Sequence, residues 1–175
     1  ISWLQVFARC VEPPSDRLAR EEFNFSIVRD ENDLSQPDWH SLRAYGGEPL
    51  VRQFIANLRD GARCAVARSE DGTLATACWF CVKDEFLPWS LRPCLWIDRC
   101  FTLPQFRGRG LYPATLRFIC RGVAGSPVES AFIECSRFNA PSRRGILKAG
   151  FSPAGQVLEF WGHRLTLGRE TEGTK

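Results

Sequence analysis

The sequence contains few or none of several residue types that are typical of common protein classes. Its 175 residues include two His, two Tyr and no Met. Because Met is missing even at position 1, we expect a processed or trimmed chain. The longest largely apolar run, 74–82, is about half of the ~18 residues that cross a bilayer, and the first residues do not resemble a signal peptide. The sequence therefore predicts a cytoplasmic protein without a membrane span.

Eight Cys are present, but their placement does not indicate a disulfide-stabilised secreted domain. Six of them fall in strand-like apolar segments, where a reduced thiol behaves as a small apolar side chain: Cys64, Cys78, Cys81, Cys94, Cys100 and Cys135. The C-x-x-C at 78–81 has neither a second C-x-x-C nor a nearby His, which argues against zinc. We expect eight free thiols, a reducing compartment and no metal.

Charge is distributed unevenly along the chain. Residues 1–60 carry seven Lys/Arg and ten Asp/Glu, whereas residues 99–148 carry nine Lys/Arg and two Asp/Glu. A basic second half fits an anionic ligand, either a phosphorylated cofactor or nucleic acid, and a solvated basic surface is the alternative. No basic patch interleaved with aromatic residues occurs elsewhere, so nucleic acid is the least favoured partner.

The hydrophobic pattern predicts a single domain at 21–167, preceded by an N-terminal helical extension at 1–20 and followed by a polar tail at 168–175. Strands are predicted at 23–28, 63–68, 73–83, 95–103, 130–135 and 157–165. Helices are predicted at 36–45, at 48–60, after Gly108 and after Asn139. This order predicts an α/β fold in which helices cover a mixed sheet.

The most informative segment is 102–112, Thr-Leu-Pro-Gln-Phe-Arg-Gly-Arg-Gly-Leu-Tyr. A strand of bulky residues runs into a turn with two glycines that opens a helix. Glycine allows close approach of a ligand to the backbone, and the first N–H groups of a helix have no internal partner. With the helix dipole and two Arg, this terminus is suited to a phosphate or pyrophosphate. The alternative is an ordinary strand-to-helix turn with surface Arg.

A second motif follows along the chain: strand 132–135, then Asn139 as the cap of a helix, then Gly150-Phe151 at the end of that helix. In this order the two motifs resemble the GNAT superfamily of N-acyltransferases. Residues 105–110, Gln-Phe-Arg-Gly-Arg-Gly, match the family's Q/R-x-x-G-x-G/A loop. The detailed resemblance covers 95–152 and leads us to expect a mixed, mostly antiparallel sheet of six or seven strands with helices on both faces.

The resemblance implies that the chain binds acetyl-CoA or another acyl-CoA as co-substrate. It implies that the strand before the loop pairs with the pantetheine arm, that the loop amides hold the pyrophosphate, and that the Asn at the next helix contacts the cofactor. The residues it assigns to acyl-CoA are Phe101, Thr102, Leu103, Arg107, Gly108, Arg109, Gly110, Leu111, Tyr112, Asn139 and Ser142. Pro113 removes one N–H and predicts a late start of the helix or the loss of one helical bond.

The chain departs from the family at the proton donor. Many members carry a Tyr in the helix before Gly-Phe, where this sequence has Ile146, which cannot donate a proton. The thiolate of CoA then leaves without a dedicated acid or with the help of water. Tyr112 is the one tyrosine near the expected site.

Two carboxylates, Asp98 and Glu134, are the candidate catalytic bases for the incoming amine. Burial of a carboxylate in a strand raises its pKa toward a useful value. The alternative for Asp98 is an ion pair with Arg99 or Arg92. The alternative for Glu134 is a role in orienting an arginine, either Arg137 or Arg143.

We therefore expect a CoA-dependent N-acyltransferase in which a primary amine attacks the thioester directly, since no motif supports covalent catalysis. Acetyl transfer is favoured. A long-chain N-acyl amino acid or acyl-homoserine-lactone synthase is the first alternative, because 19 Trp and Phe residues could line an acyl tunnel. A non-catalytic acyl-CoA-binding module is the second. The acceptor is a small-molecule or peptide amine that no motif identifies. A homodimer is one of the assemblies that the sequence allows.

Overall fold

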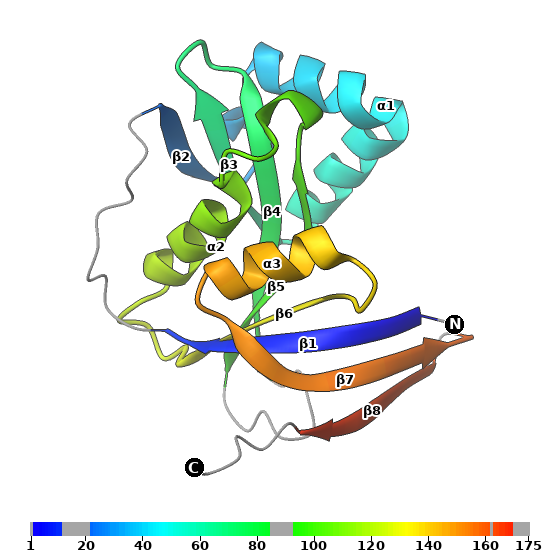
Figure 1. Cartoon of the computed structure of the whole chain (residues 1–175). Helices are drawn as coiled ribbons and strands as arrows, with labels where there is room; N and C mark the ends of the chain where they lie inside the picture. The colour runs from blue at the N-terminus through cyan, green and yellow to red at the C-terminus, as the bar shows by residue number, and fades with distance from the viewer. Residues whose placement is uncertain (1, 12–21, 85–92, 162, 170–175) are drawn as a thin grey trace.

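The centre of the molecule is one eight-stranded sheet with the strand order β2-β3-β4-β5-β6-β1-β7-β8 (Figure 1). The computed structural model describes residues 2–11, 22–84, 93–161 and 163–169. The strands are β1 Ser2–Cys10, β2 Phe23–Val28, β3 Arg63–Ser69, β4 Leu74–Lys83, β5 Cys94–Thr102, β6 Ser130–Ser136, β7 Ser152–Phe160 and β8 His163–Arg169. Among the described strands, β5 and β6 alone pair in parallel. The mixed, mostly antiparallel sheet is confirmed, with eight strands instead of six or seven.

Helices cover both faces of the β3–β4 half of the sheet, as predicted (Figure 1). They are α1 Gln36–Arg59, α2 Leu111–Gly122 and α3 Ala140–Lys148, with short 3-10 turns η1 Glu31–Asp33 and η2 Pro104–Phe106. Successive strand residues point to opposite faces, so Val66 and Trp79 pack with α1 while Ala65 and Cys78 pack with α2. In the described residues, no helix is long and apolar enough to cross a membrane.

The N-terminal segment is a strand, so the predicted helix is wrong over residues 2–10. β1 lies between β6 and β7, where Leu4 pairs with Ser136 on one side and with Val157 on the other. Its neighbouring residues Val6 and Phe7 are 0% and 1% exposed. A strand that is covered on both faces loses the alternation of apolar and polar residues, and its spacing then imitates a helix. Residues 12–20 of the predicted extension lie outside the described residues.

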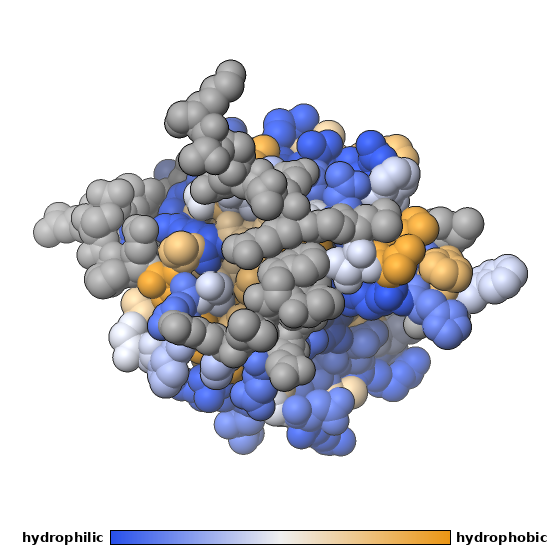
Figure 2. All heavy atoms as spheres, turned by 90° about the horizontal axis from the view of Figure 1, so that it is seen from below, coloured by the Kyte–Doolittle hydropathy of each residue, from blue (hydrophilic) through white to orange (hydrophobic). Residues whose placement is uncertain are grey.

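The C-terminal strand predicted at 157–165 is instead the β7–β8 hairpin. Its turn includes Trp161, which has φ 43° and is 95% exposed. Together with β1, this hairpin accounts for the two unpredicted strands. Seen from below, on the side of β7 and β8, the residues drawn in colour are mostly hydrophilic, and the hydrophobic ones among them lie in separate patches (Figure 2).

The predicted pair of helices at 36–45 and 48–60 corresponds to the two halves of α1. Gly47 has φ 66° and ψ −168°, and Pro49 follows it, so the helix is kinked between the halves. α1 begins at the N-cap Ser35, whose side chain and that of Asp38 form a capping box.

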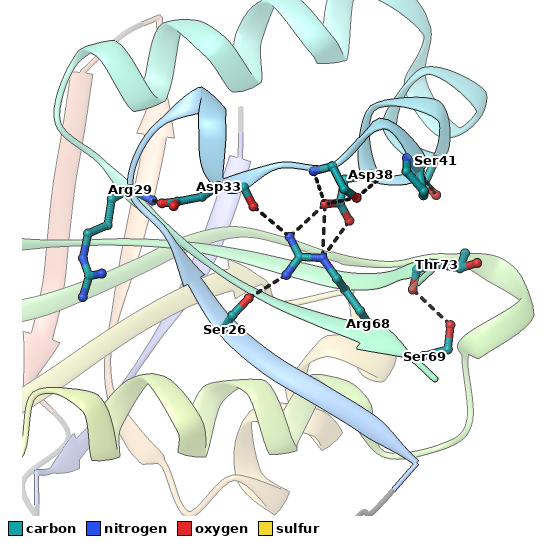
Figure 3. A network of polar contacts seen from close by, with 10 residues as sticks. Ser26, Arg29, Asp33, Asp38, Ser41, Arg68, Ser69 and Thr73 are labelled. Atoms are coloured by element: carbon teal, nitrogen blue, oxygen red, sulfur yellow. Dashed lines mark hydrogen bonds and ion pairs between the residues drawn. The ribbon is translucent and has the colours of Figure 1, made fainter. Parts of the chain in front are cut away.

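A buried ion pair fixes the start of α1 on the sheet (Figure 3). Arg68 of β3 lies 2.8 Å (Nη2) from Oδ2 of Asp38, whose side chain is fully buried. The same guanidinium donates to Oγ of Ser26 at 2.6 Å and to the carbonyl oxygen of Asp33 at 3.2 Å. One side chain therefore ties β2, β3, η1 and α1 together.

Candidate functional site

The two parallel strands β5 and β6 separate toward their C-terminal ends. Backbone pairing joins 94–97 to 130–133, and beyond it the strands continue as 98–102 and 134–136. In the described structure these two segments do not pair with each other. We call the space between them the β5–β6 opening. An extended ligand can add to such an unpaired strand edge through backbone hydrogen bonds.

A β-bulge bends β5 where the opening begins. Arg99 and Cys100 form the bulge, since the register against β4 shifts between Ala77 and Trp79. Arg99 has φ 43°, in the left-handed region that is uncommon for non-glycine residues. A bulge turns its strand away from the regular ladder, which accounts for the divergence of β5 from β6.

The chain leaves β5 through η2 and enters α2 at a glycine-containing loop. Gly108 and Gly110 have φ 77° and 72°, and a Cβ atom on Gly108 would meet nothing within 4 Å. Gly110 is the N-cap of α2 and has no side chain to satisfy the first amides of the helix. The predicted disturbance by Pro113 is absent: α2 begins at Leu111, so this proline lies in the first turn, where its N–H has no intrahelical partner to lose.

Two exposed arginines flank this open helix terminus. Arg107 donates from Nε to the carbonyl oxygen of Thr102 at 3.0 Å, and the Arg109 guanidinium lies 5.7 Å from the ring centroid of Phe106. Open amides, the positive end of a helix dipole and two guanidinium groups together fit a pyrophosphate. This loop is the end of the segment that also forms one side of the β5–β6 opening.

The next helix, α3, begins at the predicted cap. Oδ1 of Asn139 accepts a hydrogen bond from the backbone N–H of Ser142 at 3.1 Å. The Ser142 hydroxyl lies 3.3 Å from the hydroxyl of Tyr112, which comes from α2. The first turns of α2 and α3 therefore meet beside the opening. Ile146, at the position of the family's Tyr, is fully buried in the core.

The ring of Tyr112 occupies space that a glycine provides. A Cβ atom on Gly145 would lie 2.4 Å from Cδ1 and 2.8 Å from Cε1 of Tyr112. A glycine inside a helix costs about 1 kcal/mol relative to Ala, so Gly145 has a packing reason in α3. Burial raises the pKa of Tyr112 well above the ordinary value of 10, so its hydroxyl stays protonated.

Asp98 lies on the opposite side of the sheet from Tyr112. It pairs with Trp79 in the ladder, and Trp79 packs with α1. Oδ2 of Asp98 accepts from Nε of Arg99 at 3.2 Å, and Nη1 of Arg99 donates to Oδ1 of Asn57 at 2.8 Å. The ion pair weighed as the alternative for Asp98 is therefore present with Arg99, while Arg92 lies outside the described residues.

Glu134 shares that side of the sheet with Asp98, since each follows, by two residues, one member of the cross-strand pair Trp96–Phe132. Its carboxylate accepts a hydrogen bond from Nη2 of Arg164 in β8. Burial raises the pKa of Glu134, although Arg164 acts in the opposite direction. The two carboxylates are close enough that the charge of Asp98 also raises the pKa of Glu134.

The structure does not pair Glu134 with either arginine considered as its alternative partner, Arg137 or Arg143. Nη1 of Arg143 donates to the carbonyl oxygen of Arg137 at 3.3 Å, and the Arg137 guanidinium lies 4.0 Å from the ring centroid of Trp3. Arg164 could not be predicted as the partner of Glu134, because no local pattern indicates where β8 lies relative to β6, from which two other strands separate it in the sheet. The structure has eight free thiols, and no group of three metal-ligating side chains comes together in the described part of the chain.

Comparison with known proteins gives matches in structure only. No family model and no curated protein sequence matches the chain. A GNAT-family acetyltransferase from Colwellia psychrerythraea superposes with a TM-score of 0.61 at 12% identity, over 89% of this chain and 54% of that one, so the chain spans about half of its length. An aminoglycoside antibiotic 6'-N-acetyltransferase from Acinetobacter baumannii gives 0.63 at 15% identity, over 79% and 96%. A predicted acetyltransferase with acetyl-CoA from Clostridium acetobutylicum gives 0.52 at 17%, over 74% and 90%. The chain has the fold of GNAT acetyltransferases.

Proposed function

We propose that this chain, which has the GNAT fold, is a CoA-dependent N-acyltransferase that moves an acetyl group from acetyl-CoA to a primary amine by direct attack. The observation that carries the proposal is the continuity of the β5–β6 opening with the loop 107–111. A pantetheine arm is extended and ends in a pyrophosphate, so it needs an unpaired strand edge that leads to an anion site. The solved Clostridium acetyltransferase with acetyl-CoA supports this ligand.

Residues of β5, the loop and α3 would hold acyl-CoA. The backbone of Phe101, Thr102 and Leu103 would pair with the pantetheine arm. The amides of Gly108, Gly110, Leu111 and Tyr112, with the guanidinium groups of Arg107 and Arg109, would hold the pyrophosphate, and Asn139 and Ser142 would lie beside the arm.

The groups that act on the amine lie on one face of the sheet. When bound, acyl-CoA supplies an activated thioester. The amine approaches from the side of Asp98 and Glu134, where carboxylate oxygens can accept a hydrogen bond or a proton from it. Glu134 is the better base, because burial raises the pKa of its carboxyl toward neutrality. Asp98, paired with Arg99, orients the amine.

Calorimetry and a thiol-release assay test the proposal. We expect acetyl-CoA to bind more tightly than octanoyl-CoA or palmitoyl-CoA, and free CoA to appear with at least one member of a panel of small amines and peptides. Glu134→Gln should bind acetyl-CoA normally and lose turnover, whereas Glu70→Gln, an exposed control in the β3–β4 turn, should retain it. Tighter binding of a long chain would favour the long-chain synthase. Binding without thiol release would favour the non-catalytic module, and no binding at all would refute the proposal.

A further inference from the structure

We propose that Tyr112 is the catalytic acid of this site, delivering its phenolic proton from α2 to the sulfur that leaves as the new amide forms. The inference rests on the proposed function and identifies a residue for one of its steps. Attack of an amine on a thioester expels a thiolate, and a hydrogen-bond donor at that sulfur lowers the barrier. The side chain of Ile146 in α3 has no exchangeable proton, so a proton donor supplied by the protein would come from another element.

The hydroxyl of Tyr112 lies beside the β5–β6 opening, where the proposed function puts the thioester. Its side chain packs against the same core cluster as Cys100 of β5 and Cys135 of β6, and both thiols are near enough to raise its pKa beyond the effect of burial. These cysteines belong to the two diverging segments of the β5–β6 opening. Its hydroxyl is 3.3 Å from Oγ of Ser142 in the first turn of α3. The phenol therefore reaches the opening from the side of α2 and α3, opposite the carboxylates of Asp98 and Glu134.

Helix α3 is shaped to receive this side chain. Gly145 leaves the space that the Tyr112 ring fills, since any Cβ there would approach Cδ1 to 2.4 Å. The neighbouring Ile146 is turned into the core. The acid is thus supplied by one helix and positioned by the other, with Ser142 and Gly145 as positioning residues.

The step balances without any further reactant. The amine nitrogen forms a bond to the acyl carbon, the C–S bond breaks, and its electron pair goes to sulfur. Sulfur takes the phenolic proton of Tyr112, while Glu134 takes the proton that the amine loses. The phenolate regains a proton from solvent through the Ser142 hydroxyl, and Glu134 releases its proton to solvent.

Tyr112→Phe tests this role, with Tyr45→Phe as the control, because Tyr45 is the other tyrosine and stacks on Phe101 from α1. We expect Tyr112→Phe to bind acetyl-CoA within twofold of the wild type and to lose roughly 100-fold in kcat. The loss should shrink when the donor is an acetyl thioester of an aryl thiol of low pKa, because such a thiolate leaves without a proton. Tyr45→Phe should keep its activity with both donors.

Gly145→Ala provides a second measurement. The added methyl group should displace the phenol and lower kcat in the wild-type background, and it should cost nothing further in the Tyr112→Phe background. A kcat for Tyr112→Phe within twofold of the wild type, or an equal loss with every leaving group, would overturn the assignment. A wild-type protein that releases no thiol from acetyl-CoA would instead refute the proposed function, so the two failures are distinguishable.

Discussion

Replacement of Gly108 by Val tests whether this glycine is needed for the fold or for binding of the ligand. Gly108 has φ 77°, and Gly72, in the turn between β3 and β4, has φ 81°. A Cβ atom at either glycine would meet nothing within 4 Å. Gly72→Val is therefore a matched control, with the same strain and the same open surroundings, outside the candidate site.

The expected loss of folding stability follows from the backbone conformation at these two glycines. A left-handed conformation costs an L-residue about 1–2 kcal/mol, and the Cβ atom itself meets no neighbour within 4 Å at either position. For a chain of this size, a loss of 1 kcal/mol lowers Tm by about 2–4 °C. Both variants should therefore melt several degrees below the wild type and remain folded at 25 °C.

The affinity for acetyl-CoA should distinguish Gly108→Val from Gly72→Val. A Val side chain at Gly108 would occupy the open space in front of the loop amides, and each charge-assisted hydrogen bond lost there costs about 1.5–3 kcal/mol. Because 1.4 kcal/mol corresponds to tenfold in affinity, Gly108→Val should bind acetyl-CoA at least tenfold more weakly, while Gly72→Val binds as the wild type does. Calorimetric titration measures this, after circular dichroism has established equal folding. Equal affinity of the two variants would refute the assignment of the loop to the pyrophosphate.

Three further predictions concern charge. Asp38→Asn should lower the free energy of unfolding in urea by about 3 kcal/mol, because it leaves the guanidinium of Arg68 without its buried carboxylate. The stability contributed by Glu134 is full below its unfolded pKa near 4.5 and is lost as pH rises through its raised folded pKa. Glu134→Gln should therefore flatten the profile of stability against pH in that window, measured by denaturation at each pH, and a variant that keeps the decline would contradict the assignment. Arg107→Ala and Arg109→Ala should each weaken acetyl-CoA binding by about 1–2 kcal/mol at low salt and by less at high salt, since both side chains are exposed. Calorimetry at two salt concentrations tests this, and a loss independent of salt would argue against a direct charge contact.

Local signals predicted the parts of the fold that local structure determines. The turn residues 70–72 predicted the β3–β4 hairpin, which the structure confirms with a turn at the same place. Asn139 predicted the start of α3 because its side chain can accept from an amide three residues on, and it does. The two glycines at 108 and 110 likewise predicted a loop that opens α2.

Pairing between segments that are distant in the sequence could not be predicted from local patterns. Nothing in residues 2–10 indicates that two strands from the far end of the chain enclose them, and nothing near Arg164 indicates that it reaches Glu134. The bulge at Arg99 is also a property of the β4–β5 register and not of β5 alone. Gly145 is different. A glycine inside a short helix is locally unfavourable, a signal that our predictions did not use, and the structure gives its cause in the close approach of Tyr112.

The central position of β1 has a consequence for the way the chain folds. Leu4 must find Ser136 and Val157, which follow it by 132 and 153 positions. Contacts so distant in sequence slow folding, because the loop between them must close before the pairing stabilises anything. During synthesis β1 leaves the ribosome before β6 and β7 and has both edges unpaired until they arrive, which exposes it to aggregation. Since β6 has β5 on one side and β1 on the other, the β5–β6 opening reaches its final shape among the last events of folding. We therefore expect acyl-CoA binding to recover later during refolding than the β3–β4 hairpin.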